Sequence, residues 1–177
     1  GKQIHDDVVN RGLLHKDNVL GNALVDMYAK CGMLVKAEEL LKELPARSVV
    51  SWNALITGYV EQRHDEEALA CFELMNNRIC PDVVTYTSLL KACGSLGETI
   101  KTQDIHFEIT RKGLERSNYI VNTLVDVYAR CHMLLEAEDL FSKLPGVIFC
   151  WHCRSLITFT SSFSKDNLEI IHMLPHI

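Results

Sequence analysis

The segment Leu24–Cys31 reads LVDMYAKC, and Leu124–Cys131 reads LVDVYARC, one hundred residues later. The likeness continues on both sides, because the windows 18–45 and 118–145 share residues at many positions with this same offset. Both windows end on a proline, Pro45 and Pro145. Chance does not produce such agreement, so the chain contains an internal duplication.

Fainter copies divide the interval of one hundred residues. Asn22 and Tyr28 are echoed 31 residues later by Asn53 and Tyr59. Cys93 follows Tyr59 by 34 residues, and Tyr128 follows Cys93 by 35. The chain is therefore built from repeats of 31 to 35 residues whose lengths differ slightly.

Each repeat carries two apolar stripes with helical spacing. In the first stripe, apolar residues recur at i, i+3, i+4 and i+7, as in Trp52, Leu55, Ile56 and Tyr59. The segments SVVSW (48–52) and DVVTYT (82–87) favour strands by local propensity. The equivalent segment NVLGNALVDMY (18–28) has a helical pattern, so we expect helices that begin near Val50 and Val84. The pattern predicts an all-α fold, a right-handed α-solenoid of helix-turn-helix repeats.

The composition narrows the class of partner. Apolar residues make up 47% of the chain and the net charge is −5, which is acidic for a protein that binds phosphates. No apolar run approaches the roughly 20 residues that span a bilayer, so no membrane partner is expected. The first residues, GKQIHDDVVN, lack the features of a targeting peptide, and we expect any targeting segment upstream of this chain. The seven cysteines lie mostly in apolar helical patterns and are predicted to be reduced thiols.

A row of helical hairpins offers one similar surface per repeat and no enclosed pocket. Such a surface suits an extended, repetitive ligand. We therefore expect neither a small-molecule substrate nor a cofactor. The sequence also lacks a catalytic triad, a phosphate-binding loop or a supported carboxylate pair, so no catalytic residue is predicted. A peptide and a single-stranded nucleic acid are the two candidate ligands.

The text PARSVVSWNALITGY (45–59), with GNALVDMYAKCG (21–32) and PDVVTYTSLLKAC (81–93), resembles the pentatricopeptide repeats of plant organellar proteins. The cycle of lengths is similar to the subclass that alternates long, short and standard repeats. This resemblance implies the following segments: 1–17, second helix and exit loop of a truncated long-type repeat; 18–48, short-type; 49–82, standard; 83–117, long-type; 118–147, short-type; and 148–177, a degraded repeat or divergent tail. It also implies that the chain is a fragment of a protein of mitochondria or chloroplasts.

The resemblance implies that each repeat contacts about one base of single-stranded RNA. Two residues per repeat hydrogen-bond the base edge, and an apolar neighbour packs on its face. The implied pairs are Asn53 with Asp82 for uracil, Asn22 with Ser48 for a pyrimidine with cytosine favoured, Thr87 with Ser117 in the long-type repeat, and Asn122 with Val147 for an undefined base. The implied stacking residues are Val19, Val50, Val84 and Tyr119, and the implied phosphate contacts are Lys30 and Arg130.

In this family, the subclass commonly directs cytidine-to-uridine editing. The resemblance therefore implies RNA editing by addressing, with proteins of an editing complex as possible partners and no enzymatic activity in this chain. Structural explanations stand beside these roles, because Asn near a helix start and Asp82 after Pro81 also suit helix caps, and the valines also suit packing between repeats.

Two other functions stay open at this point. A tetratricopeptide-like protein scaffold fits Trp52, Leu55 and Tyr59, and the acidic net charge favours it. Ile56 in place of a small residue, and the variable repeat length, favour the pentatricopeptide alternative. A zinc module could use the tail residues Cys150, Cys153, His172 and His176. Because Trp151 matches Trp52 of a repeat, no metal site is predicted there.

Overall fold

The computed structural model describes residues 18–76 and 79–142, with the side chains of residues 76, 141 and 142 left out. This part of the chain contains eight α-helices, one 3-10 helix and no strand, as an α-solenoid of helical hairpins requires, which confirms the predicted fold class. It divides into two compact units at residues 96 and 97, and each is described by itself. Both ends of the chain, with the expected partial repeats 1–17 and 148–177 and the four candidate zinc ligands, lie outside the described residues. None of the described helices has the length and hydropathy needed to cross a membrane.

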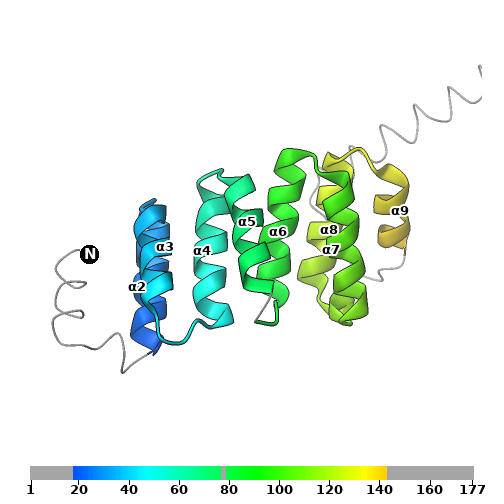
Figure 1. Ribbon diagram of the computed structural model, residues 1–177. Helices are drawn as coiled ribbons and strands as arrows, with labels where there is room; N and C mark the ends of the chain where they lie inside the picture. Colours follow the sequence, from blue (N-terminus) through cyan, green and yellow to red (C-terminus); the bar gives the residue numbers. More distant parts are fainter. Residues whose placement is uncertain (1–17, 77–78, 143–177) are drawn as a thin grey trace, which may run out of the picture. The chain divides into compact units, whose positions relative to one another are not determined.

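The first unit contains five helices in two layers (Figure 1). They are α2 (Asn18–Lys30), α3 (Leu34–Glu43), α4 (Val49–Glu61), α5 (Asp65–Asn76) and α6 (Val83–Leu96). One layer is the series α2, α4, α6, in which each helix packs against the next. The other layer contains α3, which packs on α2, and α5, which packs on α4 and α6. The helices α4 and α6 begin at Val49 and Val83, one residue before the predicted starts.

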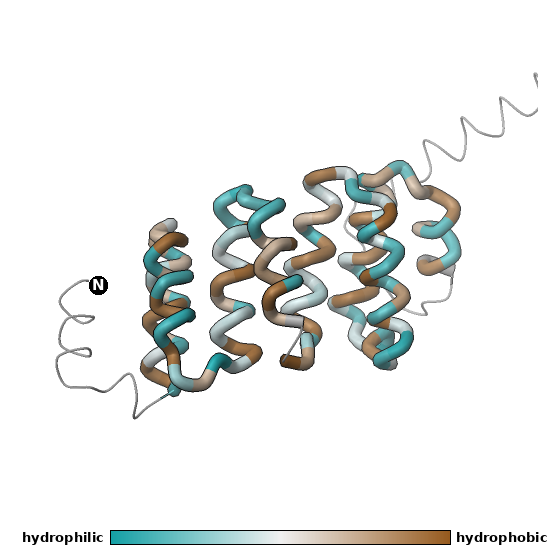
Figure 2. Tube along the Cα trace, in the orientation of Figure 1, coloured by the Kyte–Doolittle hydropathy of each residue, from teal (hydrophilic) through white to brown (hydrophobic). Residues whose placement is uncertain are grey.

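The core of this unit lies between the two layers. The predicted stripes supply it, and Val25, Leu55, Ile56 and Leu89 are fully buried. Apolar and polar residues alternate along each helix, as the colours of the tube in Figure 2 show. Burial of a side chain of this size stabilises a fold by about 1.5–3 kcal/mol, so the stripes rather than local propensity determine which face of each helix turns inward.

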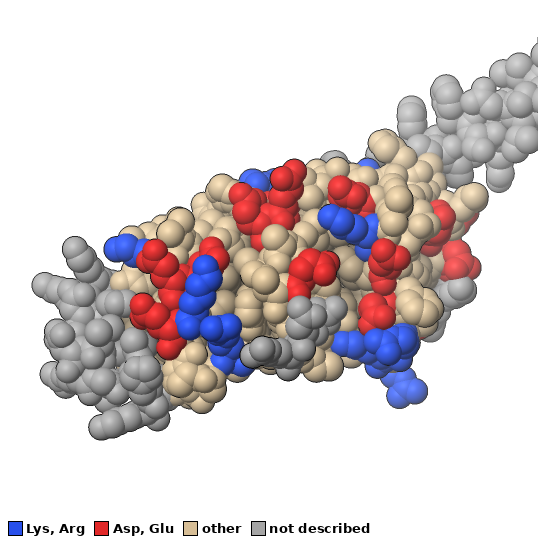
Figure 3. Space-filling view, in the orientation of Figure 1, with Lys and Arg blue, Asp and Glu red and all other residues tan. Residues whose placement is uncertain are grey.

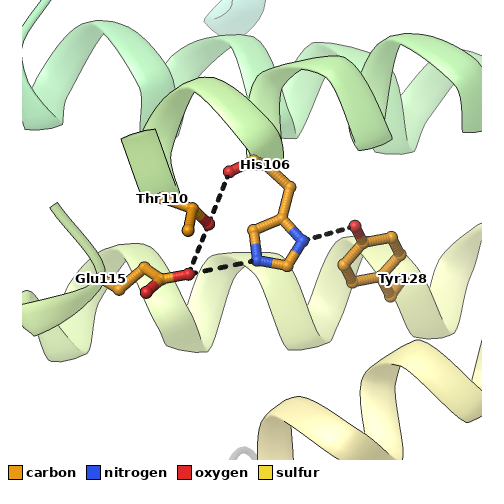
Figure 4. Close-up of polar contacts among 4 residues, drawn as sticks. All are labelled: His106, Thr110, Glu115 and Tyr128. Carbon is orange, nitrogen blue, oxygen red and sulfur yellow. Dashed lines mark hydrogen bonds and ion pairs between the residues drawn. The ribbon is translucent and has the colours of Figure 1, made fainter. Parts of the chain in front are cut away.

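The second unit contains α7 (Thr99–Arg111), the 3-10 helix η2 (Leu114–Arg116), α8 (Asn118–Arg130) and α9 (Leu134–Ser142). Helix α8 packs against α7, η2 and α9. His106 of α7 links three of these elements (Figure 4). Its Nδ1 lies 2.7 Å from the hydroxyl of Tyr128, and its Nε2 lies 3.7 Å from Oε1 of Glu115. Burial raises the pKa of Tyr128 to about 12, so the phenol keeps its proton for this contact.

A left-handed residue ends the first helix of each pair. Gly32 after α2 has φ of 73°, and His132 after α8 has φ of 60°. In the second case the amide of Met133 donates to the Tyr128 carbonyl at 2.9 Å, and that of His132 donates to the Ala129 carbonyl at 3.2 Å. This is the hydrogen-bond pattern of a Schellman C-cap, which favours glycine at the left-handed position.

We therefore expect opposite effects from two exchanges at equivalent positions. His132→Gly should raise the free energy of unfolding by about 1 kcal/mol, because glycine adopts a positive φ without a steric penalty. Gly32→Ala should lower it by about the same amount. Chemical unfolding followed by circular dichroism measures both, and changes of the same sign would contradict this account of the two turns.

Candidate nucleic-acid interface

A groove of about 680 Å³ runs along the layer formed by α2, α4 and α6 in the first unit. Its lining repeats from helix to helix. It contains three valines, three small or hydroxyl residues and five polar or charged residues: Val19, Val50, Val84, Ala23, Ala54, Thr57, Asn22, Asn53, Asp26, Asp82 and Lys30. We call this set the groove. It combines apolar surface with a few polar groups, as ligand sites commonly do.

The valines of the groove occupy equivalent places. Val19, Val50 and Val84 are each the second residue of their helix, and they are 75%, 57% and 50% exposed. A single exposed valine is ordinary, but three at one register along a groove form an apolar row. The expected fourth stacking residue, Tyr119, is likewise the second residue of α8 and exposed, and it lies in the second unit.

Asn53 and Asp82 lie together at the groove. The Nδ2 atom of Asn53 donates to Oδ1 of Asp82 at 2.9 Å, and the Thr85 hydroxyl donates to Oδ1 of Asn53 at 2.6 Å. The nitrogen and the oxygen of the Asn53 amide are therefore both hydrogen-bonded within the protein. The residue is 9% exposed and lies at the edge of the groove. We call Asn53, Asp82 and Thr85 the Asn53 cluster.

The local chain direction explains how Asp82 reaches Asn53. Asp82 stands just before α6, where its Oδ1 accepts from the backbone N–H of Thr85 at 3.0 Å and its own N–H donates to the Thr85 hydroxyl at 3.2 Å. This reciprocal arrangement is a capping box, and it fixes the carboxylate at the start of the helix. The expected capping role and the proximity to Asn53 thus occur in the same residue.

Hydrogen bonds keep the Asp82 carboxylate ionised. Burial alone would raise its pKa, but hydrogen bonds from the backbone of Thr85 and Val84 and from the Asn53 amide outweigh burial and hold the pKa below its usual range. At neutral pH the carboxylate is therefore an acceptor only, without a proton to donate.

The Asn22 cluster, made of Asn22, Ser48 and Ser51, is the equivalent arrangement one repeat earlier. The Ser48 hydroxyl donates to Oδ1 of Asn22 at 3.4 Å. Ser48 caps α4, because its Oγ accepts a hydrogen bond from the Ser51 backbone N–H. In return, the backbone N–H of Ser48 donates to the Ser51 hydroxyl at 3.0 Å. The distance of 3.4 Å between Ser48 and Asn22 indicates a looser pair than Asn53 with Asp82.

Neither Thr87 nor Asn122, the first members of the other two expected pairs, lines the groove. Thr87 is 2% exposed, and its hydroxyl donates to the Val83 carbonyl at 2.6 Å, so it lies inside the packed layers. Its expected partner Ser117 belongs to the second unit. Asn122 is exposed on α8, and its expected partner Val147 lies outside the described residues.

The two expected phosphate contacts each carry an acidic neighbour. Nζ of Lys30 lies 2.8 Å from Oδ2 of Asp26, and this hydrogen bond raises the Lys30 pKa. A guanidinium nitrogen of Arg130 lies 3.9 Å from Oδ2 of Asp126. The groove itself therefore holds two carboxylates, Asp26 and Asp82, and one ammonium group, Lys30. Figure 3 shows basic and acidic side chains interspersed over the described part of the face in view, without a continuous basic tract on that face.

Sequence reasoning missed Thr85, Ser51 and Asp26. The first two stand three residues after Asp82 and Ser48, which is the spacing of a capping box and could have identified them. Asp26 stands four residues before Lys30, the spacing at which a carboxylate and an ammonium group pair on one helix face.

Models of known protein families match most of this region. The PPR repeat family matches residues 47–95, and the PPR repeat matches residues 22–49, 84–114 and 119–146. The chain belongs to the pentatricopeptide repeat family. The matched segments contain the clusters of Asn22 and Asn53 and the whole groove except Val19.

Curated relatives of this pentatricopeptide repeat chain come from Arabidopsis thaliana. One, named a mitochondrial pentatricopeptide repeat-containing protein, is 34% identical over 96% of this chain and 16% of its own length. A second, named chloroplastic, is 30% identical over 93% of this chain and 25% of its own length. A third, named as a putative mitochondrial member, is 38% identical over 98% of this chain and 28% of its own length. The chain thus spans between about a sixth and three tenths of these relatives.

Proposed function

We propose that this chain binds single-stranded RNA along the groove, with one base at the Asn53 cluster and one at the Asn22 cluster. The observation that carries the proposal is the coincidence of an exposed valine row with paired polar groups at equivalent positions of successive helices. A base offers two apolar faces and a polar edge, which such a groove can contact separately.

The chemistry of the Asn53 cluster favours uracil. The second proton of Asn53 Nδ2 has no hydrogen-bond partner among the described residues, and Asp82 supplies an acceptor beside it. The edge of uracil carries a carbonyl acceptor next to an N–H donor, so the donor and the acceptor of the protein match it. Cytosine presents the reverse order along the same edge, with an amino donor at C4 and a ring-nitrogen acceptor at N3, so a donor and an acceptor held in a fixed order match uracil better.

The groove fits a role in which base contacts outweigh charge. With two carboxylates and one ammonium group, it offers little attraction to phosphates. Few bases are engaged, so we expect weak binding that depends on sequence. The same charge balance favours a basic peptide as the alternative ligand of a tetratricopeptide-like scaffold, and the RNA experiment below distinguishes the two.

We further infer that the chain addresses an RNA rather than modifying it. The groove presents amide, hydroxyl and carboxylate groups engaged with one another, with no nucleophile activated by a base among its lining residues. Site recognition for cytidine-to-uridine editing in a plant mitochondrion or chloroplast is the proposed context. Proteins of an editing complex would then supply the chemistry, and the relatives named for these organelles support the location.

Asn53→Thr tests base selection directly. The shorter side chain makes room for a larger base and replaces the amide by a hydroxyl, so the preferred base at this cluster should move from uracil toward guanine. We expect the ratio of the two affinities to change on the order of tenfold. Fluorescence anisotropy at one fixed salt concentration, with short labelled RNAs that differ only at this base, measures the ratio.

Asn118→Thr is the matched control, because Asn118 is exposed at the start of α8 and lies outside the groove. It should leave the preference for uracil unchanged. Equal affinity of the unmodified chain for all four RNAs would refute base selection at this cluster. Failure to bind any of them would refute the RNA proposal, and tight binding of a basic peptide instead would support the scaffold.

A further inference from the structure

Thr85 lies beneath the pair formed by Asn53 and Asp82 and contacts both. It is fully buried and does not line the groove, so it cannot touch a ligand there directly. Its hydroxyl lies 2.6 Å from Oδ1 of Asn53 and 3.0 Å from Oδ1 of Asp82, and its backbone N–H donates to the same carboxylate oxygen. A single buried side chain thus connects both groups proposed to contact the base.

The protons of this cluster determine the orientation of the Asn53 amide. The Thr85 hydroxyl carries one proton, and Oδ1 of Asp82 already accepts from Asn53 Nδ2 and from the Thr85 N–H. The proton is therefore best placed on the shorter contact, to Oδ1 of Asn53. Asp82 then holds the nitrogen end of the amide, and Thr85 holds the oxygen end.

A held amide presents one kind of group to the groove. Because Oδ1 of Asn53 is occupied from below by Thr85, the free part of the amide is the second Nδ2 proton, a donor. A reversed amide would point Oδ1 toward the acceptor-only carboxylate of Asp82, 2.9 Å away, and would leave the Thr85 proton without its acceptor. Both neighbours therefore oppose reversal.

We propose that Thr85 is a positioning residue for base selection: by fixing the Asn53 amide with its nitrogen outward, it makes this cluster select uracil over cytosine. This inference rests on the proposed RNA function. A mobile amide can present either its donor or its acceptor to a base, and it discriminates poorly between these two pyrimidines. The buried hydroxyl removes that freedom.

The Asn22 cluster supplies a comparison within the chain. Ser51 occupies the position equivalent to Thr85, but its hydroxyl bonds within the cap of α4, to the carbonyl and N–H of Ser48. Among the described residues, Ser48 alone hydrogen-bonds the Asn22 side chain, at 3.4 Å, and its hydroxyl can either donate or accept. This cluster lacks the second hold on its amide, and it should accept uracil and cytosine with similar affinity.

Thr85→Val tests the proposal, because valine keeps the buried shape and removes the hydroxyl. RNAs that carry uracil or cytosine at the base of the Asn53 cluster are compared by anisotropy at one salt concentration. We expect the intact chain to prefer uracil on the order of tenfold, and Thr85→Val to reduce that ratio severalfold but not to one, because Asp82 alone still opposes reversal of the amide. Thr85→Ser keeps the hydroxyl and should retain most of the preference.

Thr102→Val is the matched control. Thr102 is also fully buried, its hydroxyl donates to the Glu98 carbonyl at 2.8 Å, and it belongs to the second unit and does not line the groove. It should leave the ratio unchanged. Thermal unfolding of every variant identifies a temperature at which all are folded, and the side-chain amide resonances of Asn53 by NMR report its environment without RNA. These resonances should shift in Thr85→Val and stay in place in Thr102→Val.

The outcomes separate the two proposals. A Thr85→Val chain that keeps the tenfold ratio would overturn the role of Thr85 and leave RNA binding intact. Equal loss of the ratio in Thr85→Ser would also overturn it, since the hydroxyl would then not be the determining group. Failure of the intact chain to discriminate uracil from cytosine would overturn the inference together with the proposed selectivity.

Discussion

Replacing Val50 by aspartate is expected to weaken RNA binding by at least about tenfold without loss of fold. Val50 is 57% exposed, so its side chain contributes little to the core. It lines the groove between Val19 and Val84, and a base packed on it would lose apolar contact worth up to about 1–3 kcal/mol by analogy with stacking platforms. A carboxylate there also repels the phosphates of any bound strand.

Val35→Asp is a close control for this substitution. Val35 is the second residue of α3, as Val50 is the second residue of α4, and it is 70% exposed. It does not line the groove. An acidic residue in the first turn of a helix is mildly stabilising, so both variants should unfold like the original chain or slightly later.

RNA titrations of the two variants, each beside a thermal unfolding curve, measure the difference. Equal loss of affinity in both would indicate a general effect of added negative charge rather than a contact at Val50. An unchanged affinity in Val50→Asp would exclude the valine row from the RNA site.

The second large effect is expected in the packing of the first unit. Gly58 of α4 faces α2, and a Cβ atom at this residue would lie 2.6 Å from Cβ and 3.3 Å from Cα of Ala29. No side-chain rotation can relieve this clash, so the backbones of α2 and α4 would have to move apart. We expect Gly58→Ala to lower the free energy of unfolding by about 2 kcal/mol, although alanine is the better helix former by roughly 1 kcal/mol.

Gly21→Ala provides the comparison. A Cβ atom at Gly21 would lie 2.5 Å from Cδ2 of Leu44, which is the end of a rotatable side chain. Leu44 can adjust its rotamer, so the cost should be less than about 1 kcal/mol. Urea unfolding of both variants measures the difference, and equal losses would show that the approach of α2 to α4 is not the limiting contact.

The fold could be predicted because comparison among the repeats shows where the local secondary-structure propensity is misleading. The segment around Val49 and Val83 is rich in β-branched residues, yet α4 and α6 begin there. The same positions in α2 carry a clear helical stripe, and homologous repeats must adopt one conformation to stack. Burial of that stripe outweighs a propensity difference of a few tenths of a kcal/mol per residue.

The candidate site could be predicted only in part. The family resemblance implied Asn53 and Asp82, and the spacing of a capping box relates Thr85 to Asp82. No spacing rule reveals the contact of Thr85 with Asn53, because this contact depends on how α6 approaches α4. The same resemblance placed Thr87 with Asn53, yet the two side chains behave differently. Threonine is short and bonds to the carbonyl four residues earlier, as its hydroxyl commonly does in helices, whereas asparagine extends to the next helix. The role of these residues toward RNA stays a prediction.

The ion pair between Asp26 and Lys30 has a consequence for kinetics. A cation that is already neutralised by its neighbour produces almost no field beyond the Debye length of about 8 Å at physiological salt. Oligonucleotides would then meet the groove by unassisted diffusion, with association rate constants near 10⁵–10⁶ M⁻¹s⁻¹ rather than at the electrostatically accelerated limit. Discrimination between transcripts would then depend on the dissociation rate constant of each RNA. This discrimination would change little with ionic strength.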